Sequence, residues 1–484
     1  MINWKITFRL LAFPILWMSI VQLIFAALSA FLFKDNVSVS FLLPASIMLF
    51  TASVILLKTQ HVDSSLANFR DALIYATATW VIAGFLGAIP IILVTKVSFT
   101  DGMFESISAL TTTGATILSG LDDMPRTFLL YRQFLQWMGG LGIVIFVVAI
   151  LPMLNIGGMK LLKAETPGPI KDEKLSPRIA NTAHYLWSVY LSITVLCTVS
   201  YYFAGMTFYD ALAHALTTVS TGGFSTHDAS MWFYKSHLIL WVANLFMIAG
   251  AINFALHFRV VHKRALGSYY ADEETRYFIY IITTLAVLSG VILYSHDTYS
   301  SFFESLSFST FHIVSFITST GFGAASFTEW PEAVGFLLII TGYLGGCAGS
   351  TAGGNKIIRN ILVVKMLNNN FKQLLHPRAI FTIKYQGSPV KDDVLHAVMA
   401  FMTFAAGSSM LFTLLLMFTG LDFWSAFSAV AACVNVLGPG FGEVGANFAP
   451  VSDAGTWILT SAMLVGRLEY FTVFALFTRT FWKQ

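Results

Sequence analysis

The sequence predicts an all-α membrane protein in which two leading spans precede four pseudo-symmetric repeats, each a span, a short pore helix and a second span, around one pore. Three observations predict this fold. Hydrophobic residues fill 56% of the 484 positions and charged residues only 11%, against about 25% charged in soluble domains. Apolar stretches of spanning length recur along the chain, and a short helix with a glycine turn recurs four times. Lipid must therefore surround most of the surface.

Ten segments meet the requirement of about 20 apolar residues to cross roughly 30 Å of hydrocarbon. The first is too long for a signal-peptide core and no small-residue cleavage site follows it, so we expect a retained span. The eighth is interrupted by a glycine-rich stretch. The segments lie near residues 9–33, 40–57, 71–95, 128–154, 181–205, 236–257, 277–296, 333–367, 394–419 and 455–481.

Lysine and arginine are distributed unevenly between the two sides of the predicted bundle. The side that holds both termini receives 21 of the 28, and the opposite side receives 5. Because cytoplasmic loops are enriched in Lys and Arg, we expect the richer side and both termini to be cytoplasmic. Lys356 and Arg467 remain inside the membrane.

Composition and motifs exclude several classes of function. The net charge of +3 gives no concentrated basic face for nucleic acid. The three cysteines have neither metal-ligand spacing nor a disulfide framework, and no GxSxG or HExxH motif indicates a hydrolase. No predicted cytoplasmic connection holds a strand followed by GxGxxG, so regulation by a nucleotide would need a separate protein. We expect no enzyme and no cofactor in this chain.

Four shorter semi-apolar segments lie on the outer side between spans and recur about every 100 to 120 residues. They are too short to cross, and re-entrant backbone is tolerated only where it is buried in protein or lines an aqueous path. Each has an acid near its outer end, which complements the positive helix N-terminus, while the C-terminal carbonyls favour a cation at the membrane centre. The acids are Asp101, Asp210, Glu304 and Asp422.

These segments divide the chain into two leading helices and four repeats. The predicted boundaries are 1–65 for the leading helices and 66–160, 175–265, 270–370 and 390–484 for the repeats.

Small residues and glycine follow each short helix. Glycine lets successive carbonyls face an axis without a side chain filling the lumen, as in the carbonyl filters of potassium channels, so a dehydrated alkali cation is the natural ligand. One such turn is commonplace, since small residues also pack helices together; four at equivalent positions indicate a filter. The predicted residues that bind this cation are Thr113, Gly114, Thr221, Gly222, Thr320, Gly321, Leu437 and Gly438.

Three other polar residues lie on the short helices. Glu105 is explained equally by an outer-vestibule charge and by a solvated helix end. His214 and His312 each stand alone on their segments, so we expect them to pack or to bond within their helices rather than to bind metal.

Arg467 lies near the middle of the last span, where a positive charge raises the barrier to a cation in the same pore. Alternatively, it neutralises an acid on a neighbouring span or at a subunit contact. Glu469, two residues further, does not share its helical face.

The run from 345 to 356 cannot hold an uninterrupted helix, because each glycine costs about 1 kcal/mol relative to alanine. It is not a nucleotide-binding P-loop, since Asn355 precedes Lys356 and Ile357 follows it. We expect a mobile loop that acts as a gate together with Arg467. Its glycines are Gly345, Gly346, Gly349, Gly353 and Gly354.

Besides the four turns, three stretches resemble the membrane subunits of the Trk/Ktr/HKT superfamily of potassium transporters, most closely the TrkH type. They are QFLQWMGGLGIVIF from Gln133, GGCAGSTAGGNKIIRN from Gly345 and GRLEYF from Gly466. The resemblance covers essentially the whole chain and implies potassium preference, with a loop beneath the filter that obstructs the path together with Arg467. The filter glycines it implies are Gly114, Gly222, Gly321 and Gly438. The fourth turn departs from the Thr-Gly pattern, so we expect its coordination through backbone alone.

The resemblance also implies a homodimer in the inner membrane of a bacterium and a cytosolic, nucleotide-binding regulatory subunit of the TrkA type. We expect its docking surface in the basic loops 160–178, 259–276 and 359–391, which ordinary positive-inside flanks explain equally well. A different hypothesis is a proton- or sodium-coupled transporter with inverted repeats and midplane carboxylates. Here the repeats share one orientation, and Glu469 is the main buried acid.

Overall fold

The computed structural model describes residues 3–62, 69–145, 176–379, 381–468 and 470–483. Within them the predicted all-α architecture is confirmed, because the only strands are the two-residue pair β1 (Lys384–Tyr385) and β2 (Ser388–Pro389). Two leading helices come first, α1 (Trp4–Ala27, prolonged by the π-helical turn η1, Leu28–Phe33) and α2 (Ser38–Lys58).

Four groups of helices follow, each with a long helix, a short helix and a second helix. Group 1 holds α3 (Phe69–Thr95), α4 (Phe99–Leu110) and α5 (Arg126–Ile145); group 2 holds α7 (Ser176–Phe203), α8 (Phe208–Val219) and α9 (His237–Ala251); group 3 holds α12 (Glu273–Ser295), α13 (Phe302–Ile317) and α14 (Glu332–Leu344); group 4 holds α16 (Asp392–Met417), α17 (Phe423–Val434) and α18 (Asp453–Arg467).

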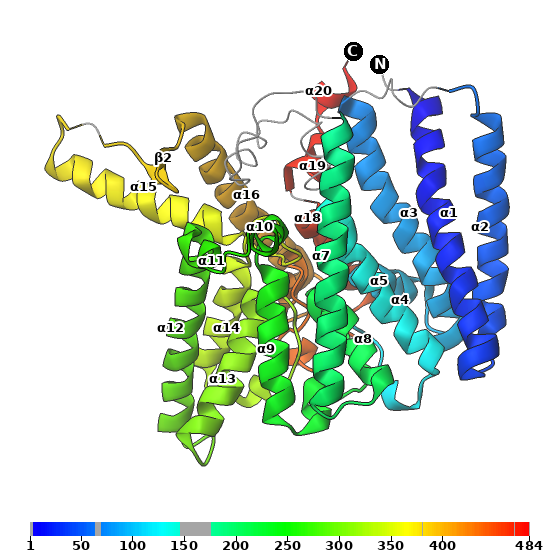
Figure 1. Cartoon of the computed structure of the whole chain (residues 1–484), viewed down its shortest axis with the longest axis horizontal. Coiled ribbons are helices and arrows are strands. Elements are labelled where there is room, and N and C mark those ends of the chain that lie inside the picture. Colours follow the sequence, from blue (N-terminus) through cyan, green and yellow to red (C-terminus); the bar gives the residue numbers. More distant parts are fainter. Residues whose placement is uncertain (1–2, 63–68, 146–175, 380, 469, 484) are drawn as a thin grey trace.

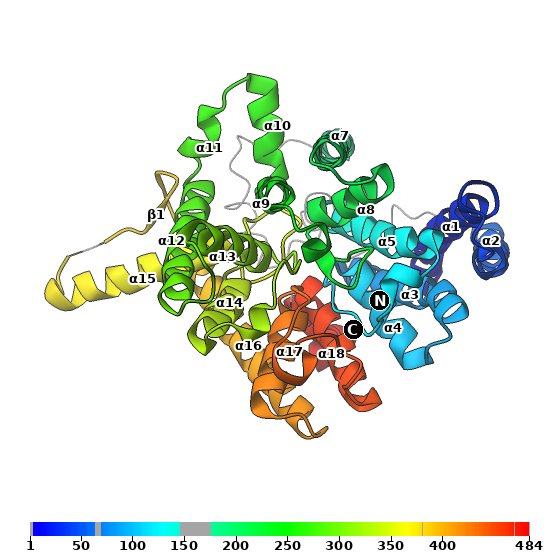
Figure 2. The ribbon, with the colours of Figure 1, turned by 90° about the horizontal axis from the view of Figure 1, so that it is seen from below.

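The four groups surround a common centre, and α1 and α2 lie outside group 1 (Figure 2). Each group has a short 3-10 helix between its short helix and the helix that follows: η3 (Leu121–Asp123), η6 (Ser230–Tyr234), η7 (Phe327–Glu329) and η8 (Gly442–Val444). The remaining elements are α10 (Phe254–Lys263), α11 (Gly267–Ala271), α15 (Ile357–Leu375), α19 (Tyr470–Ala475) and α20 (Arg479–Trp482).

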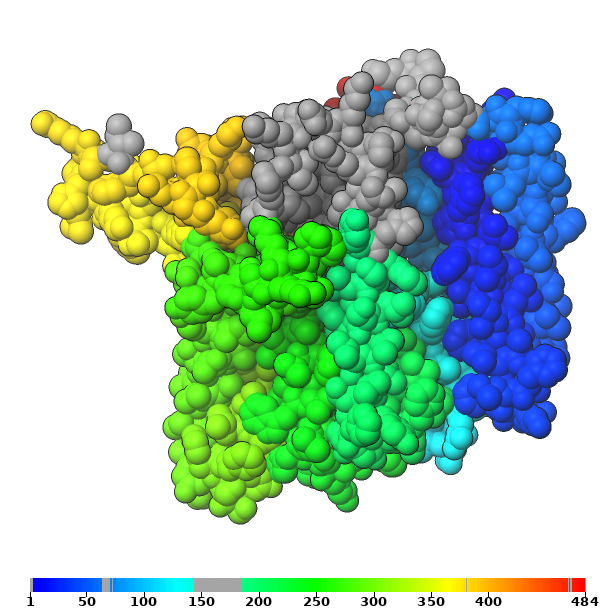
Figure 3. Space-filling model, viewed as in Figure 1, coloured from blue at the N-terminus to red at the C-terminus, as the bar shows by residue number. Residues whose placement is uncertain are grey.

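The start of α1 and helix α20 lie at the same end of the molecule, whereas α8 and α13 lie in the opposite half (Figure 1). Helix α15 begins against α12 and α16 and projects sideways from the body at the end that holds α20, and its outer part extends beyond the other helices (Figure 1 and Figure 3).

Long apolar helices form the outer layer. Six helices among the described residues are long and apolar enough to cross a membrane, or seven if the bent pair α9 and α10 counts as one span. Large hydrophobic side chains such as Phe50, Phe203 and Met410 are exposed on their outer faces, as lipid contact requires. The short helices, in contrast, are buried along most of their length.

The second helices of groups 2 to 4 are shorter than a complete span. The predicted break in the eighth span is present, between α14 and α15. The predictions of continuous spans at 236–257 and 455–481 were wrong, because α9 and α10 meet at an angle of 98° and α18 ends at Arg467. At the first of these breaks Asn253 caps α10, its side chain accepting a hydrogen bond from the N–H of Ala255. The part of the predicted span 128–154 beyond residue 145 lies outside the described residues.

The short helices begin with side-chain caps. Ser98, Thr207 and Ser301 accept hydrogen bonds from the backbone N–H groups of the predicted acids Asp101, Asp210 and Glu304, which lie in the first helical turn. In the fourth helix the acid is itself the cap, since Asp422 accepts from Trp424 and Ser425. A hydroxyl or carboxylate cap fixes where each helix starts and complements its positive end.

Candidate functional site

Three consecutive residues after each short helix adopt the same backbone conformation in all four groups. The first has a positive φ: 59° at Thr112, 54° at Thr221, 53° at Ser319 and 57° at Val436. The second donates its N–H to the carbonyl five residues earlier: Thr113 to Ser108, Gly222 to Thr217, Thr320 to Ser315 and Leu437 to Ala432. The third is a glycine, again with positive φ: 81° at Gly114, 78° at Gly223, 79° at Gly321 and 102° at Gly438.

The four turns pack against one another in a closed ring. A Cβ atom added to Gly114 would lie 2.2 Å from the carbonyl oxygen of Gly222 in the next group. The corresponding distances are 1.9 Å from Gly223 to the oxygen of Thr320, 2.0 Å from Gly321 to that of Leu437 and 2.7 Å from Gly438 to that of Thr113. Each glycine is therefore required by a neighbouring carbonyl. We call these four carbonyls, of residues 113, 222, 320 and 437, the carbonyl ring.

The second turn differs by one residue from the prediction. Gly222 lies at the position of Thr113, and the glycine equivalent to Gly114 is Gly223, which the sequence reasoning missed. A signal was available, since the glycine follows the helix cap by 16 residues in groups 1, 2 and 4 (Ser98 to Gly114, Thr207 to Gly223, Asp422 to Gly438). The predicted pairs Thr113–Gly114, Thr320–Gly321 and Leu437–Gly438 occupy the second and third positions of their turns.

Arg467 contacts the glycine loop directly. Its side chain is buried, and its guanidinium donates to the carbonyl oxygens of Thr351, at 3.0 Å, and Gly139, at 3.3 Å. Neither contact is an acid, so the described residues do not support the alternative in which Arg467 neutralises a carboxylate. Glu469 lies outside the described residues.

The loop from 345 to 356 lies against the inner ends of three of the four short helices. Thr351 Oγ1 donates to the carbonyl of Val219, the last residue of α8, at 3.0 Å. The N–H of Gly353 donates to Ser319 Oγ at 2.6 Å, and a Cβ on Gly353 would lie 2.2 Å from the carbonyl oxygen of Asn435. The loop therefore lies directly beneath the carbonyl ring, held by more contacts than its glycine content suggested.

Glu274 joins the two ends of this loop. Its buried carboxylate accepts hydrogen bonds from the N–H groups of Ala348, at 2.9 Å, and Ile358, at 3.0 Å. The sequence reasoning missed this residue, because an acid in the first turn of a helix is ordinarily explained by the helix dipole.

Glu105 is neither an outer-vestibule charge nor a solvated helix end, so both interpretations were wrong. It is 0% exposed and pairs with Arg132, itself 1% exposed, at 2.9 Å. An unpaired carboxylate would not be stable there. His214 and His312 bond within their helices as expected, each through Nδ1 to a carbonyl four residues earlier, at 2.8 Å. Across the described ranges, no group of three His, Cys, Asp or Glu residues has the arrangement of a metal site.

A charged cluster joins groups 1 and 2 on the side of the ring away from the glycine loop. His227 contacts Asp122 through Nδ1, and its Nε2 lies 3.6 Å from Asp210. Burial would lower the pKa of His227, but the two carboxylates outweigh it and raise the pKa. Burial would raise the pKa of Asp210, but hydrogen bonds with His227, Thr207 and Thr226 lower it to about 2. The hydrogen bond with His227 also lowers the pKa of Asp122.

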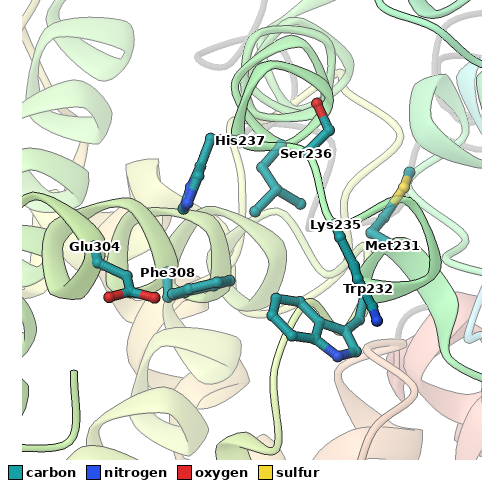
Figure 4. Close-up of a pocket in the computed structure, with 8 residues that line it drawn as sticks. Met231, Trp232, Lys235, Ser236, His237, Glu304 and Phe308 are labelled. Carbon is teal, nitrogen blue, oxygen red and sulfur yellow. The ribbon is translucent and has the colours of Figure 1, made fainter. Parts of the chain in front are cut away.

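A small pocket of about 80 Å³ lies between the segment that leads into α9 and the beginning of α13 (Figure 4). Lys235 and Glu304 give it opposite charges, and Trp232 and Phe308 supply apolar walls. It includes no residue of the carbonyl ring or of the glycine loop, and Glu304 is the acid predicted at the outer end of α13.

The chain matches the family model "TrkH: Cation transport protein" over residues 41–483. It is 43% identical to the Trk system potassium uptake protein TrkH of Vibrio parahaemolyticus over 471 residues, 96% of each chain. It is also 43% identical to TrkH of Escherichia coli K12 over 417 residues, 86% of each, and 35% identical to TrkG of that strain over 420 residues, 86% of each.

The structure superposes on the crystal structure of the potassium transporter TrkH from Vibrio parahaemolyticus with a TM-score of 0.92, at 39% identity and with 100% of both chains covered. These similarities confirm the predicted family and fold class and the expectation of a transport protein rather than an enzyme. The chain is a multi-pass membrane protein and belongs to the TrkH family of cation transport proteins.

Proposed function

We propose that this protein mediates potassium uptake across the cytoplasmic membrane of a bacterium, through one selective, channel-like pore formed by the four helix groups as repeats. The closed ring of four backbone carbonyls, each packed against a glycine of the preceding group, is the observation that carries the proposal. Carbonyl rings of this kind replace the hydration shell of potassium. The names of the relatives, which are potassium uptake proteins, support the choice of ion.

The ion-binding residues in this proposal are those of the second and third turn positions. Thr113, Gly222, Thr320 and Leu437 supply the carbonyl ring, and Gly114, Gly223, Gly321 and Gly438 allow it to close. Thr221 precedes them in the second turn. The partial negative charge at the C-terminal end of each short helix adds to the attraction for a cation.

We assign the gate to Arg467 and the glycine loop, acting in series beneath the ring. The hydrogen bond from Arg467 to Thr351 places a buried positive charge against the loop, and the loop meets the inner ends of α8, α13 and α17. Permeation past this point requires the loop to move and the guanidinium to be displaced. Glu274 anchors both ends of the moving segment.

A regulatory partner would act from the end of the molecule that holds α15 and α20, which we propose is cytoplasmic, as are both termini. Helix α15 carries an exposed apolar stripe at helical spacing, with Val364 64%, Leu367 52%, Phe371 64% and Leu374 76% exposed. Such a stripe marks a protein contact. We propose a homodimer and a TrkA-type regulatory subunit, with docking in the basic segments 259–276 and 359–391. The predicted docking loop 160–178 lies almost entirely outside the described residues.

The coupled-transporter alternative would need ionisable carboxylates along the path. Among the described residues, which do not include Glu469, the buried carboxylates Glu105 and Glu274 have other partners: Glu105 is paired with Arg132, and Glu274 accepts from backbone N–H groups. The geometry therefore favours a pore over alternating access.

Growth of a bacterium that lacks its own potassium uptake systems tests the proposal. Expression of the protein should restore growth at low external potassium and the uptake of rubidium as a tracer. Protein that is present in the membrane with its regulatory subunit, yet restores neither, would contradict the proposed function.

A further inference from the structure

Helix α5 presents two buried polar side chains, Arg132 and Gln136, one helical turn apart, toward the first two turns of the carbonyl ring. The four groups are otherwise built alike, so the equivalent positions in other groups can be identified. One glycine in each of three groups packs closely against the last residue of the short helix and serves as the reference position. The pairs are Gly139 and Leu110, Gly250 and Val219, and Gly466 and Val434.

Counting back from those glycines, Gln136 corresponds to Met247 in α9 and Met463 in α18, and Arg132 corresponds to Ala243 and Leu459. All four of these equivalents are buried and apolar. In groups 2 and 4, apolar residues are therefore enough to pack these positions. Burying an arginine and a glutamine at the same positions in group 1 costs free energy unless their polar atoms form hydrogen bonds or ion pairs. The departure from the pattern therefore needs a reason other than packing.

Gln136 forms hydrogen bonds with the residues on both sides of Gly223 in the second turn. Its Nε2 donates to the carbonyl oxygen of Gly222 at 2.6 Å, and its Oε1 accepts from the N–H of Phe224 at 3.1 Å. The oxygen of Gly222 is a member of the carbonyl ring. A carbonyl oxygen has two lone pairs, so this bond orients the Gly222 oxygen while leaving it able to coordinate an ion.

Arg132 connects the first turn to the second. Its Nη2 donates to Glu105 at 2.9 Å and to Thr116 Oγ1 at 3.1 Å, and its guanidinium carbon lies 4.1 Å from the ring centroid of Phe224. Glu105 in turn accepts from the N–H of Ile117 at 2.7 Å. The pair therefore holds the segment after Gly114 against the residue that follows Gly223.

We propose that Gln136 and the Arg132–Glu105 pair are positioning residues that fix the spacing of the carbonyl ring between groups 1 and 2, and thereby set the preference for potassium over sodium. The inference rests on the proposed function. Its physical basis is that selection between alkali cations depends on the number, position and field strength of the coordinating carbonyls. An apolar residue at position 136 would leave one of the four carbonyls without this constraint.

The test is the ratio of potassium to sodium flux in liposomes that contain the purified full-length protein. Gln136→Met introduces the residue found in groups 2 and 4, and Gln136→Glu replaces the amide donor to Gly222 with a carboxylate oxygen. Both should lower the ratio about tenfold, mainly by increasing sodium flux. Arg132→Lys keeps the charge beside Glu105 but loses the planar guanidinium, and should give an intermediate ratio. Met247→Leu, at the equivalent apolar position in α9, is the matched control and should keep the wild-type ratio.

The ratio of potassium to sodium flux is measured only on molecules that conduct ions. A variant that merely folds poorly therefore does not lower this ratio. Wild-type selectivity in both Gln136 variants and in Arg132→Lys would overturn the inference and leave the proposed function standing. A wild type that does not distinguish potassium from sodium would instead overturn the filter assignment and, with it, this inference.

Discussion

The guanidinium of Arg467 lies 3.0 Å from the carbonyl oxygen of Thr351. This hydrogen bond joins the last helix of group 4 to the glycine loop of group 3. Thr351 also donates through its hydroxyl to the carbonyls of Val219 and Gly250 in group 2. Because Arg467 donates to Gly139 in group 1 as well, one hydrogen-bonded set links all four groups beneath the carbonyl ring. A change in either the arginine or the loop should alter the same barrier.

Arg467→Ala should raise the basal potassium flux about tenfold without changing the ion preference. A unit charge about 10 Å from a cation, at an effective dielectric constant of about 20, costs that cation about 1.7 kcal/mol, and about 1.4 kcal/mol corresponds to a factor of ten in rate. Tracer flux into liposomes, normalised to folded protein, measures the change. Arg467→Lys is the control, because it retains the charge and should stay near the wild-type flux. Poor expression of Arg467→Ala with unchanged flux per folded molecule would show that the arginine is structural.

Glu274→Ala should also raise the basal flux, because it removes the acceptor that joins Ala348 to Ile358 at the two ends of the loop. Glu274→Gln keeps an oxygen acceptor and should have a smaller effect. Flux with and without the cytosolic regulatory subunit measures both variants. A normal basal flux with normal regulation in Glu274→Ala would show that the loop does not depend on this anchor.

Gly223→Ala should damage ion selectivity more than Gly222→Ala. A Cβ at Gly223 would meet the Thr320 carbonyl oxygen at 1.9 Å and would require a φ of 78°, whereas a Cβ at Gly222 would meet the Gln136 side chain and weaken its hydrogen bonds without striking the backbone of the neighbouring turn. Sodium permeation in each variant decides between the two positions, with Gly114→Ala and Gly321→Ala as positive controls. A larger defect at Gly222 than at Gly223 would contradict the equivalence of Gly223 with Gly114.

His227→Gln should reduce thermal stability most at about pH 5.5 and least at about pH 8.5. The raised pKa of His227 means that its contribution is complete below the unfolded value of about 6.5 and is lost as the pH rises through the folded value. The effect should be about 1 kcal/mol or less, because Asp122 is 46% exposed. The melting temperature in detergent, measured against pH for both proteins, gives the difference. A difference in melting temperature between the two proteins that increases toward alkaline pH would contradict this account of the cluster.

Much of the fold was predictable because each repeat carries its own local signals. The caps at Ser98, Thr207, Ser301 and Asp422 start helices whose acids are visible in the sequence, and the break after Leu344 follows from glycine. The bend at Asn253 was missed because it lies in an apolar run without proline, and one nearby glycine, Gly250, is equally explained by close helix packing. A single capping asparagine inside an apolar run is a weak signal by itself.

The candidate site could be predicted from the sequence only at positions where a single residue determines the local backbone geometry. A sequence with two adjacent glycines does not show which of them, Gly222 or Gly223, meets the neighbouring carbonyl, because that contact crosses between groups. The ion pair of Glu105 and Arg132 spans 27 residues and two helices, so neither partner identifies the other in the sequence. Long-range contacts of this kind appear only when the chain has folded.

The most direct test of the selective, passive pore is ion flux into liposomes of purified protein under imposed potassium and sodium gradients, with no proton gradient. We predict potassium flux down its own gradient, a much smaller sodium flux under the mirrored gradient, and a loss of this difference in Gly223→Ala and Gly321→Ala. Potassium movement that occurs only when a proton or sodium gradient is applied would contradict the pore and favour the coupled transporter.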